Sequence, residues 1–438
     1  MTRAIANKKI DSKAIVFLRV AFLSLVLFLF FFEWNLFSFL TTRRAAIVIS
    51  LLYLVLSRKT KMRIKSFFFF KHTKYSLFLL IPLLFNIIVN LELEKISTND
   101  YFEPIHFVNL FLYIFVFSLF VIVYVDNPFD FCYAVVLIIT IQSIFVYGSL
   151  TNYSFRMWLF RNFYNGDNRF DRFVENGSRI MGLALYSSLG SIAMLCGLIS
   201  LLYLIRKRKI NTFLFTFLYA FILIATAFIA RTGFYFGIII LVPYLFTFKK
   251  GFFAKVFSVS LVGLVAMYLF FNYLSSKVDA GQWNYLLNWM GEIFNSDTRF
   301  KTINAVSESP IPPLTIETFF GTGILRGVTD SGIEIANDSG YVEMYASLGL
   351  INAILFYSCF ILIFVSLIRS MQKDKVFFTI LLVVMFVIEF KEPYIRKYTY
   401  TTFLLTLAFL NTYGFLQSKN SYISSRNHCF SNINLQQI

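Results

Sequence analysis

At residues 321–351 the sequence reads GTGILRGVTDSGIEIANDSGYVEMYASLGLI, a glycine-rich polar loop that runs directly into an apolar stretch ending near Ile368. The charged residues of the loop are Arg326, Asp330, Glu334 and Asp338, and Glu343 follows just inside the apolar stretch. Because it costs free energy to desolvate a charge at a hydrocarbon boundary, carboxylates that are kept there are functional candidates. The alternative is that Asp338 or Ser339 caps a helix, with Glu343 in its first turn, where the helix dipole favours negative charge.

The composition of the chain is that of a membrane protein. Of its 438 residues, 58% are hydrophobic, only 14% are charged and 57 are phenylalanine, whereas soluble domains carry about 25% charged residues. We therefore predict an all-α polytopic membrane protein, with residues 1–438 as one integral membrane domain and about twelve transmembrane helices. The expected spans are residues 15–32, 36–56, 75–91, 105–125, 131–150, 180–205, 212–230, 233–248, 256–274, 341–368, 376–390 and 398–416. Arg43 and Arg44 interrupt the second of them.

The orientation of the spans follows from lysine and arginine, which are retained in cytoplasmic loops. With the N-terminus inside, the cytoplasmic segments include the basic clusters at 3–13, 58–74, 206–209, 249–255 and 369–375. The turn at 126–130, DNPFD, has no basic residue to hold it on that side. This topology accounts for the net charge of +17, so we do not interpret the charge as a nucleic-acid-binding surface. It also makes the two larger loops, 151–179 and 275–340, periplasmic.

The loop at 151–179 is rich in arginine on the side where positive charge is normally scarce. Its arginines are Arg156, Arg161, Arg169, Arg172 and Arg179. One interpretation is an amphipathic helix around Trp158 that lies in the outer interface, with arginines that pair with lipid phosphates. The other is an anion site, because guanidinium groups bind phosphate oxygens in a bidentate manner.

Arg231 forms a second candidate of this kind. The apolar pattern hardly stops between Ala230 and Gly233, so we expect a tight hairpin in which Gly233 takes a positive φ. An arginine there faces either headgroups or a polar cavity between helices, and we favour the cavity. In the loop 275–340, Trp283, Tyr285 and Trp289 have the spacing of an interfacial helix face.

Several other classes of site are excluded. The glycines at 321–323 lack the strand, spacing and lysine of a nucleotide-binding loop. The four cysteines show no metal-binding spacing, and the three histidines are far apart in the sequence, so we expect neither a metal site nor a cofactor. No cytoplasmic segment is long enough to fold around a nucleotide sugar, which leaves lipid-linked substrates on the periplasmic side.

Two stretches carry a resemblance to a known family: NDSGYVEMYASLGLINAILFY at 337–357 and ARTG at 230–233. In these stretches, and in its plan of spans and loops, the chain resembles the Wzy-type O-antigen polymerases, within the superfamily that also contains the O-antigen ligases. In ligases a His-Asn pair stands at the spacing before Gly349 where Asp338 and Ser339 stand here. The absence of that histidine favours a polymerase.

The resemblance implies a GT-C-like fold in the bacterial inner membrane, with an active site that faces the periplasm. It implies glycosyl transfer between undecaprenyl-diphosphate-linked oligosaccharides, with the lipid bilayer and a polysaccharide chain-length regulator as partners. Asp338 would be the catalytic base, and the secondary candidates are Glu343, Glu334 and Tyr341. The diphosphate would be bound by Arg231, Arg172, Arg179 and Arg326. The alternatives are a lipid-linked oligosaccharide flippase or transporter, and an O-antigen ligase.

Overall fold

The structure is a computed structural model of the full chain. The residues it describes are 2–37, 40–57, 60, 81, 84, 88, 109, 112–125, 127–163, 180, 182–184, 187–246, 268–269, 272–278, 280–291, 311–323, 327–328, 332, 334–335, 339–371, 374–395 and 398–412.

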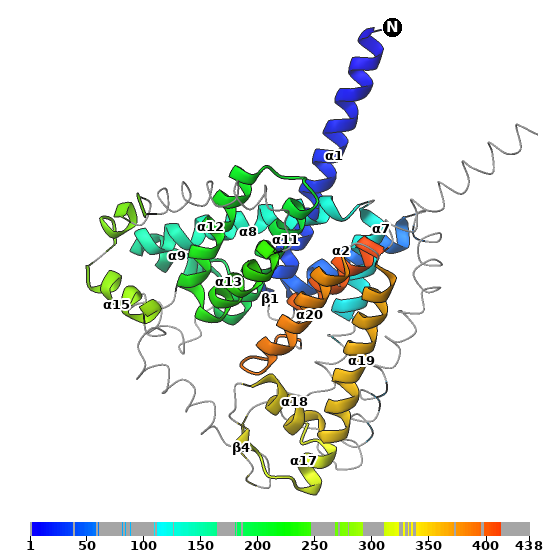
Figure 1. Cartoon of the computed structure of the whole chain (residues 1–438), viewed down its shortest axis with the longest axis vertical. Coiled ribbons are helices and arrows are strands. Elements are labelled where there is room, and N and C mark those ends of the chain that lie inside the picture. Colours follow the sequence, from blue (N-terminus) through cyan, green and yellow to red (C-terminus); the bar gives the residue numbers. More distant parts are fainter. Residues whose placement is uncertain are drawn as a thin grey trace, which may run out of the picture.

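These residues are almost entirely helical (Figure 1). The longer helices are α1 (Thr2–Phe31), α2 (Thr42–Leu56), α7 (Phe117–Tyr124, preceded by a π-helical turn at Leu112–Val116), α8 (Pro128–Thr151), α9 (Tyr153–Phe163), α11 (Ser187–Arg206), α12 (Thr212–Ile229), α13 (Arg231–Phe246), α15 (Ala280–Gly291), α18 (Gly340–Leu348), α19 (Leu350–Ser370), α20 (Lys375–Glu389) and a last helix at 399–412. Two short antiparallel strand pairs are present among the described residues. The pair β1 (Asn35–Phe37) and β2 (Leu40–Thr41) lies between α1 and α2, and the pair β3 (Gly327–Val328) and β4 (Glu334–Ile335) follows a short helix, α17 (Ile316–Phe320).

Four of the described helices are long and apolar enough to cross a membrane. They are Pro128–Thr151, Leu189–Arg206, Thr212–Ile229 and Leu350–Ser370. Each has at least 18 residues, which is within the length of about 17 to 25 residues that a span needs. The described part of the chain therefore has the character of a helical membrane protein, as the composition predicts.

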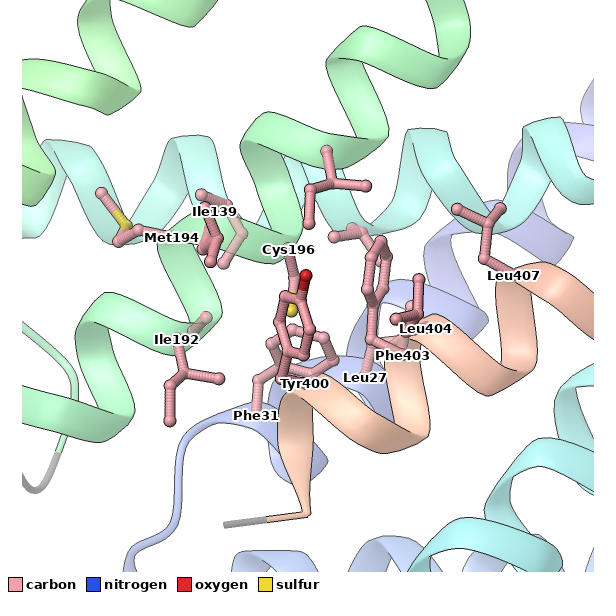
Figure 2. Close-up of a cluster of buried hydrophobic side chains, with 14 of the residues drawn as sticks. Leu27, Phe31, Ile139, Ile192, Met194, Cys196, Tyr400, Phe403, Leu404 and Leu407 are labelled. Carbon is pink, nitrogen blue, oxygen red and sulfur yellow. The ribbon is translucent and has the colours of Figure 1, made fainter. Parts of the chain in front are cut away.

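Helix α11 lies at the centre of this bundle. It packs against α8, α12 and α13, and the window of its span is 94% buried. Figure 2 shows Cys196 of α11 beside Tyr400 of the last helix, in a buried cluster that also includes Ile192 and Met194 of α11 and Ile139 of α8. Gly197 lets the backbones of α11 and α8 approach closely, because a Cβ at this position would lie 2.6 Å from Ile139 Cγ2. Small residues serve this purpose in membrane helix packing.

In the predicted second span, 36–56, the buried residue Arg43 forms an ion pair with a partly exposed glutamate. Helix α2 begins at Thr42, and Arg43 in its first turn places Nη1 2.8 Å from Glu33. The Arg43 guanidinium also lies within 6 Å of the ring centroids of Phe30, Tyr113 and Tyr398. Arg43 therefore ends the hydrophobic stretch and joins α1, α2 and the start of the last helix.

One end of the bundle is closed by a second ion-pair cluster, which we call the ion-pair end. Asp374 is 4% exposed and accepts from Arg206 Nε at 3.2 Å and from Lys207 Nζ at 2.6 Å. Lys209 lies 4.7 Å from the centroid of the Phe129 ring. The turn before α8, for which the sequence offers no basic residue, thus lies at the same end as the basic residues that follow α11.

The apolar stretch after residue 340 is two helices and not one. Gly349 separates α18 from α19 with a φ of +87°, and a Cβ there would collide with the backbone of Phe319 and Phe320. The glycine-rich residues 321–323 form hydrogen bonds with the end of α18 at this break. Thr322 N and Gly323 N donate to the carbonyls of Ala346 and Ser347 at 2.9 and 3.0 Å, so these residues satisfy the last carbonyl groups of α18.

Candidate functional site

The structure describes only some of the residues that the sequence analysis singles out. Arg231, Tyr341 and Glu343 are described in full, and Glu334 is described for its backbone, in β4. The candidates that lie outside the described residues are Asp338, Arg172, Arg179 and Arg326.

Arg231 is the first residue of α13, and it follows Ala230 in extended conformation at the end of α12. The tight connection is as expected, but the expected role of Gly233 is wrong. Gly233 is helical and does not have a positive φ. Its lack of a side chain is needed for packing instead, since a Cβ there would lie 2.8 Å from Ser191 Cβ and from Thr226 Cγ2.

The residue after Arg231 contacts a segment that is not among the candidates from the sequence. Thr232 is buried, and its Oγ1 donates to Glu392 Oε1 at 3.4 Å. Glu392 belongs to the chain between α20 and the last helix, which reads EFKEPYI from 389 to 395 and which we call the outlet segment. In Figure 1 this segment follows the end of α20, in orange, between α18 and α13.

The first residue of the outlet segment, Glu389, has a buried carboxylate. Glu389 is fully buried; Tyr357 Oη donates to its Oε1 at 2.9 Å and the backbone N of Ile395 donates to its Oε2, also at 2.9 Å. The two donors come from α19 and from the far end of the segment. A buried carboxylate that receives such hydrogen bonds holds its surroundings in one arrangement.

The N-terminus of α18 packs directly on this segment. A Cβ at Gly340 would collide with Glu389 Oε1 and would lie 2.7 Å from Pro393 Cα. The carbonyl of Gly340 lies 3.2 Å from Tyr357 Oη and shares, as a second and longer contact, the single proton that this hydroxyl group donates to Glu389. Only glycine allows this approach, so the start of α18, two residues after Asp338, is fixed against Glu389 and Pro393.

A hydroxyl pair joins the segment to the central helix. Ser191 Oγ on α11 and Tyr394 Oη are 2.9 Å apart, and both residues are buried. The outlet segment therefore contacts α11, α13, α18 and α19 through polar atoms or close backbone packing. We call the region formed by these contacts the polar junction.

Tyr341 and Glu343 have positions that favour structural roles. Tyr341 Oη donates to the carbonyl of Phe386 at 2.8 Å, and its ring lies 4.8 Å from that of Phe390. Glu343 is buried in the first turn of α18, where the helix dipole favours a carboxylate. Ser339 is the N-cap residue of α18, although its side chain makes no capping hydrogen bond.

The two aromatic stretches of the expected periplasmic loops are helical where they are described. The first is α9, in which Trp158 is half exposed. The second is α15, which contains Trp283, Tyr285 and Trp289, and of these only the Trp283 side chain is described.

The polar junction joins the segment that carries Glu389 and Glu392 to the helix that begins with Arg231. Arg231 begins the helix whose second residue contacts Glu392, and arginine is suited to phosphate oxygens. A carboxylate can accept a proton from a hydroxyl group. Among the described residues, no three of histidine, cysteine, aspartate and glutamate gather as a metal site.

The sequence did contain a signal for Glu389 and Glu392. The short connection between two predicted spans carries Lys391, Arg396 and Lys397 on the side that the topology makes periplasmic. This connection thus has the same feature as Arg231, which is positive charge on the side where the topology rule disfavours it.

Comparison with known proteins identifies no relative. The chain matches no family model, no curated protein and no solved structure.

Proposed function

We propose that this chain is an O-antigen polymerase, a glycosyltransferase that joins undecaprenyl-diphosphate-linked oligosaccharide repeat units at the periplasmic face of the bacterial inner membrane. The proposal includes a GT-C-like arrangement of about twelve spans, with periplasmic loops at 151–179 and 275–340.

The observation that supports it most is the polar junction. Arg231 and the segment around Asp338 are candidates because of independent sequence features, and they lie more than a hundred residues apart. The residues next to them meet one segment, through the contact of Thr232 with Glu392 and of Gly340 with Glu389 and Pro393. A cation and a carboxylate on elements that meet are what transfer from a diphosphate to a hydroxyl group requires.

In the proposed reaction the growing chain is the donor. The bond between sugar C1 and the lipid diphosphate breaks, and its electron pair leaves with the diphosphate. C1 forms a bond to a hydroxyl oxygen of the incoming repeat unit, and Asp338 accepts the hydroxyl proton. Arg231, with Arg172, Arg179 and Arg326, stabilises the charge on the departing diphosphate.

Glu392 is a second carboxylate for this reaction, because it lies beside the start of α13 and is only partly buried. Glu389 is fully buried and receives two hydrogen bonds. We therefore assign Glu389 a positioning role and Glu392 a place next to the reacting groups.

The lipopolysaccharide gel pattern of a deletion strain tests the proposed class. A polymerase is indicated when the ladder is lost while one repeat unit stays attached to the core, and when the wild-type gene restores the ladder. Loss of all repeats indicates a ligase or a flippase instead, and an unchanged ladder rules out all three.

A further inference from the structure

A buried arginine in α9 has no role in the polar junction. Arg156 is 7% exposed, and its Nε and Nη1 have no hydrogen-bond partner in the part of the chain that the structure describes. Its guanidinium lies over the ring of Tyr153, 5.2 Å from the centroid. Burying an uncompensated charge costs free energy, and this burial lowers the pKa of Arg156.

The position of Arg156 within its helix adds to this cost. It is the fourth residue of α9, near the end where the helix dipole is positive, and the first turn of α9 contains no acidic residue. The capping oxygen does not offset the charge, because Asn152 Oδ1 accepts from Phe155 N. The whole helix, YSFRMWLFRNF, contains two arginines and no carboxylate.

The location of α9 indicates where a compensating anion can come from. The helix follows directly after α8, a candidate span, through Asn152 alone. Tyr153 and Trp158 are 56% and 50% exposed, and half-exposed aromatic residues of this kind are typical of the headgroup region of a bilayer. The buried side of α9, with Leu159 and Phe160, packs against the bundle.

We infer that Arg156 binds the phosphate of a phospholipid headgroup and thereby fixes α9 to the bilayer surface at the end of α8. The fork of a guanidinium group matches phosphate oxygens, and a phosphate would supply acceptors for both Nε and Nη1. Arg156 is not one of the residues assigned to the proposed diphosphate site, and the inference does not depend on the proposed function.

Replacing Arg156 by an apolar side chain of similar length tests this inference, because the expected change in stability differs with and without phospholipid. The full chain and Arg156→Met are compared by thermal unfolding in dodecyl maltoside alone, and in the same micelles with phosphatidylglycerol. We expect phosphatidylglycerol to raise the midpoint of the wild type by about 2 °C or more, and to leave that of Arg156→Met unchanged. Without lipid, the variant should be at least as stable as the wild type, because it buries no unpaired charge.

Arg161→Met is the matched control, since Arg161 lies on the same helix but is exposed. It should respond to phosphatidylglycerol as the wild type does. If Arg156→Met is destabilised equally in both conditions, a carboxylate of the chain compensates Arg156 and the inference is wrong. If Arg156→Met is more stable than the wild type by the same amount in both conditions, no anion binds to Arg156, and the inference is wrong as well.

The source of the phosphate is tested separately. Inorganic phosphate at the same concentration should not reproduce the shift, because it lacks the acyl chains that keep the headgroup at α9. If inorganic phosphate does reproduce it, or if undecaprenyl diphosphate stabilises the wild type and phosphatidylglycerol does not, the assignment to a phospholipid is overturned.

Discussion

The ion-pair end and the polar junction bind their carboxylates in different ways. At the ion-pair end, Asp374 lies between Arg206 and Lys207, which follow one another at the end of α11. At the polar junction, Glu389 accepts from a tyrosine hydroxyl group and a backbone N–H, and Glu392 accepts from a threonine hydroxyl group.

This difference separates structural support from a candidate reaction centre. The ion pair joins the end of α11 to the connection between α19 and α20, whereas the polar junction brings together α11, α13, α18, α19 and the outlet segment. Ion pairs can fix two loops without any requirement for glycine or for a particular hydroxyl group. The junction uses Gly233 and Gly340 for close approach, which fixes the backbone near Arg231 and Asp338. A site that acts on a substrate needs such a fixed surrounding.

The largest effect is expected for Asp338→Asn. Because asparagine has nearly the same shape as aspartate but cannot accept the proton, polymer formation should fall by about 10²- to 10⁴-fold at normal protein levels. The measurement is the lipopolysaccharide ladder together with the amount of inserted protein. Asp374→Asn is the control from the ion-pair end, and the protein that remains inserted should still polymerise. A normal ladder from Asp338→Asn would show that Asp338 is not the base, and Glu392→Gln, Glu343→Gln and Glu334→Gln would then be compared.

Arg231→Lys should have the next largest effect. Lysine keeps the charge but loses the bidentate fork, and a charge-assisted hydrogen bond contributes about 1.5 to 3 kcal/mol, so the rate of polymer formation should fall roughly tenfold to a hundredfold. Arg206→Lys makes the same change at the ion-pair end and should leave the rate unchanged. Equal rates for the wild type and Arg231→Lys, with Arg172→Ala and Arg179→Ala also normal, would place the diphosphate site elsewhere.

Gly340→Ala tests whether the approach of α18 to the outlet segment matters. The added methyl group collides with Glu389 Oε1 and crowds Pro393, and forcing such a group into a packed interior costs about 1 to 3 kcal/mol. We expect a lower unfolding midpoint and less polymer per inserted protein. Unchanged stability would mean that α18 and the outlet segment are not packed as described.

Tyr357→Phe should have the smallest effect on the junction. It removes one donor to Glu389 and leaves the donation from the backbone of Ile395, which should cost about 1 kcal/mol of stability. Thermal unfolding of the purified variant gives this value. A loss of polymer far larger than the loss of stability would show that Glu389 touches the substrate, contrary to its assigned positioning role.

The sequence predicts the parts of the fold that depend on local pattern. The apolar stretches at 131–150 and 212–230 correspond to α8 and α12, because Asn127 and Asn211 cap these helices and polar residues bound them. The break at Gly349 escapes this reasoning, since the apolar pattern continues across it and only the packing against Phe319 and Phe320 requires it.

The same distinction applies to the candidate site, where some residues can be recognised from the local sequence and others only from contacts between distant segments. Arg231 can be identified as a candidate from its sequence neighbours alone, because its positive charge lies on the side that the topology rule disfavours. The contact of Thr232 with Glu392 joins residues that are 160 positions apart, and no periodicity in the sequence connects them. Glu389 also looks like the charged edge of a span, and its complete burial depends on donors from α19 and from beyond Pro393.

The most direct test of the account is the reaction of the purified chain with an undecaprenyl-diphosphate-linked repeat unit. Chain growth and release of undecaprenyl diphosphate are measured together for the wild type, Asp338→Asn and Asp374→Asn. The account predicts that the wild type and Asp374→Asn release one undecaprenyl diphosphate for each new linkage, and that Asp338→Asn does neither. Absence of chain growth in the wild type, or equal growth with Asp338→Asn, would contradict it.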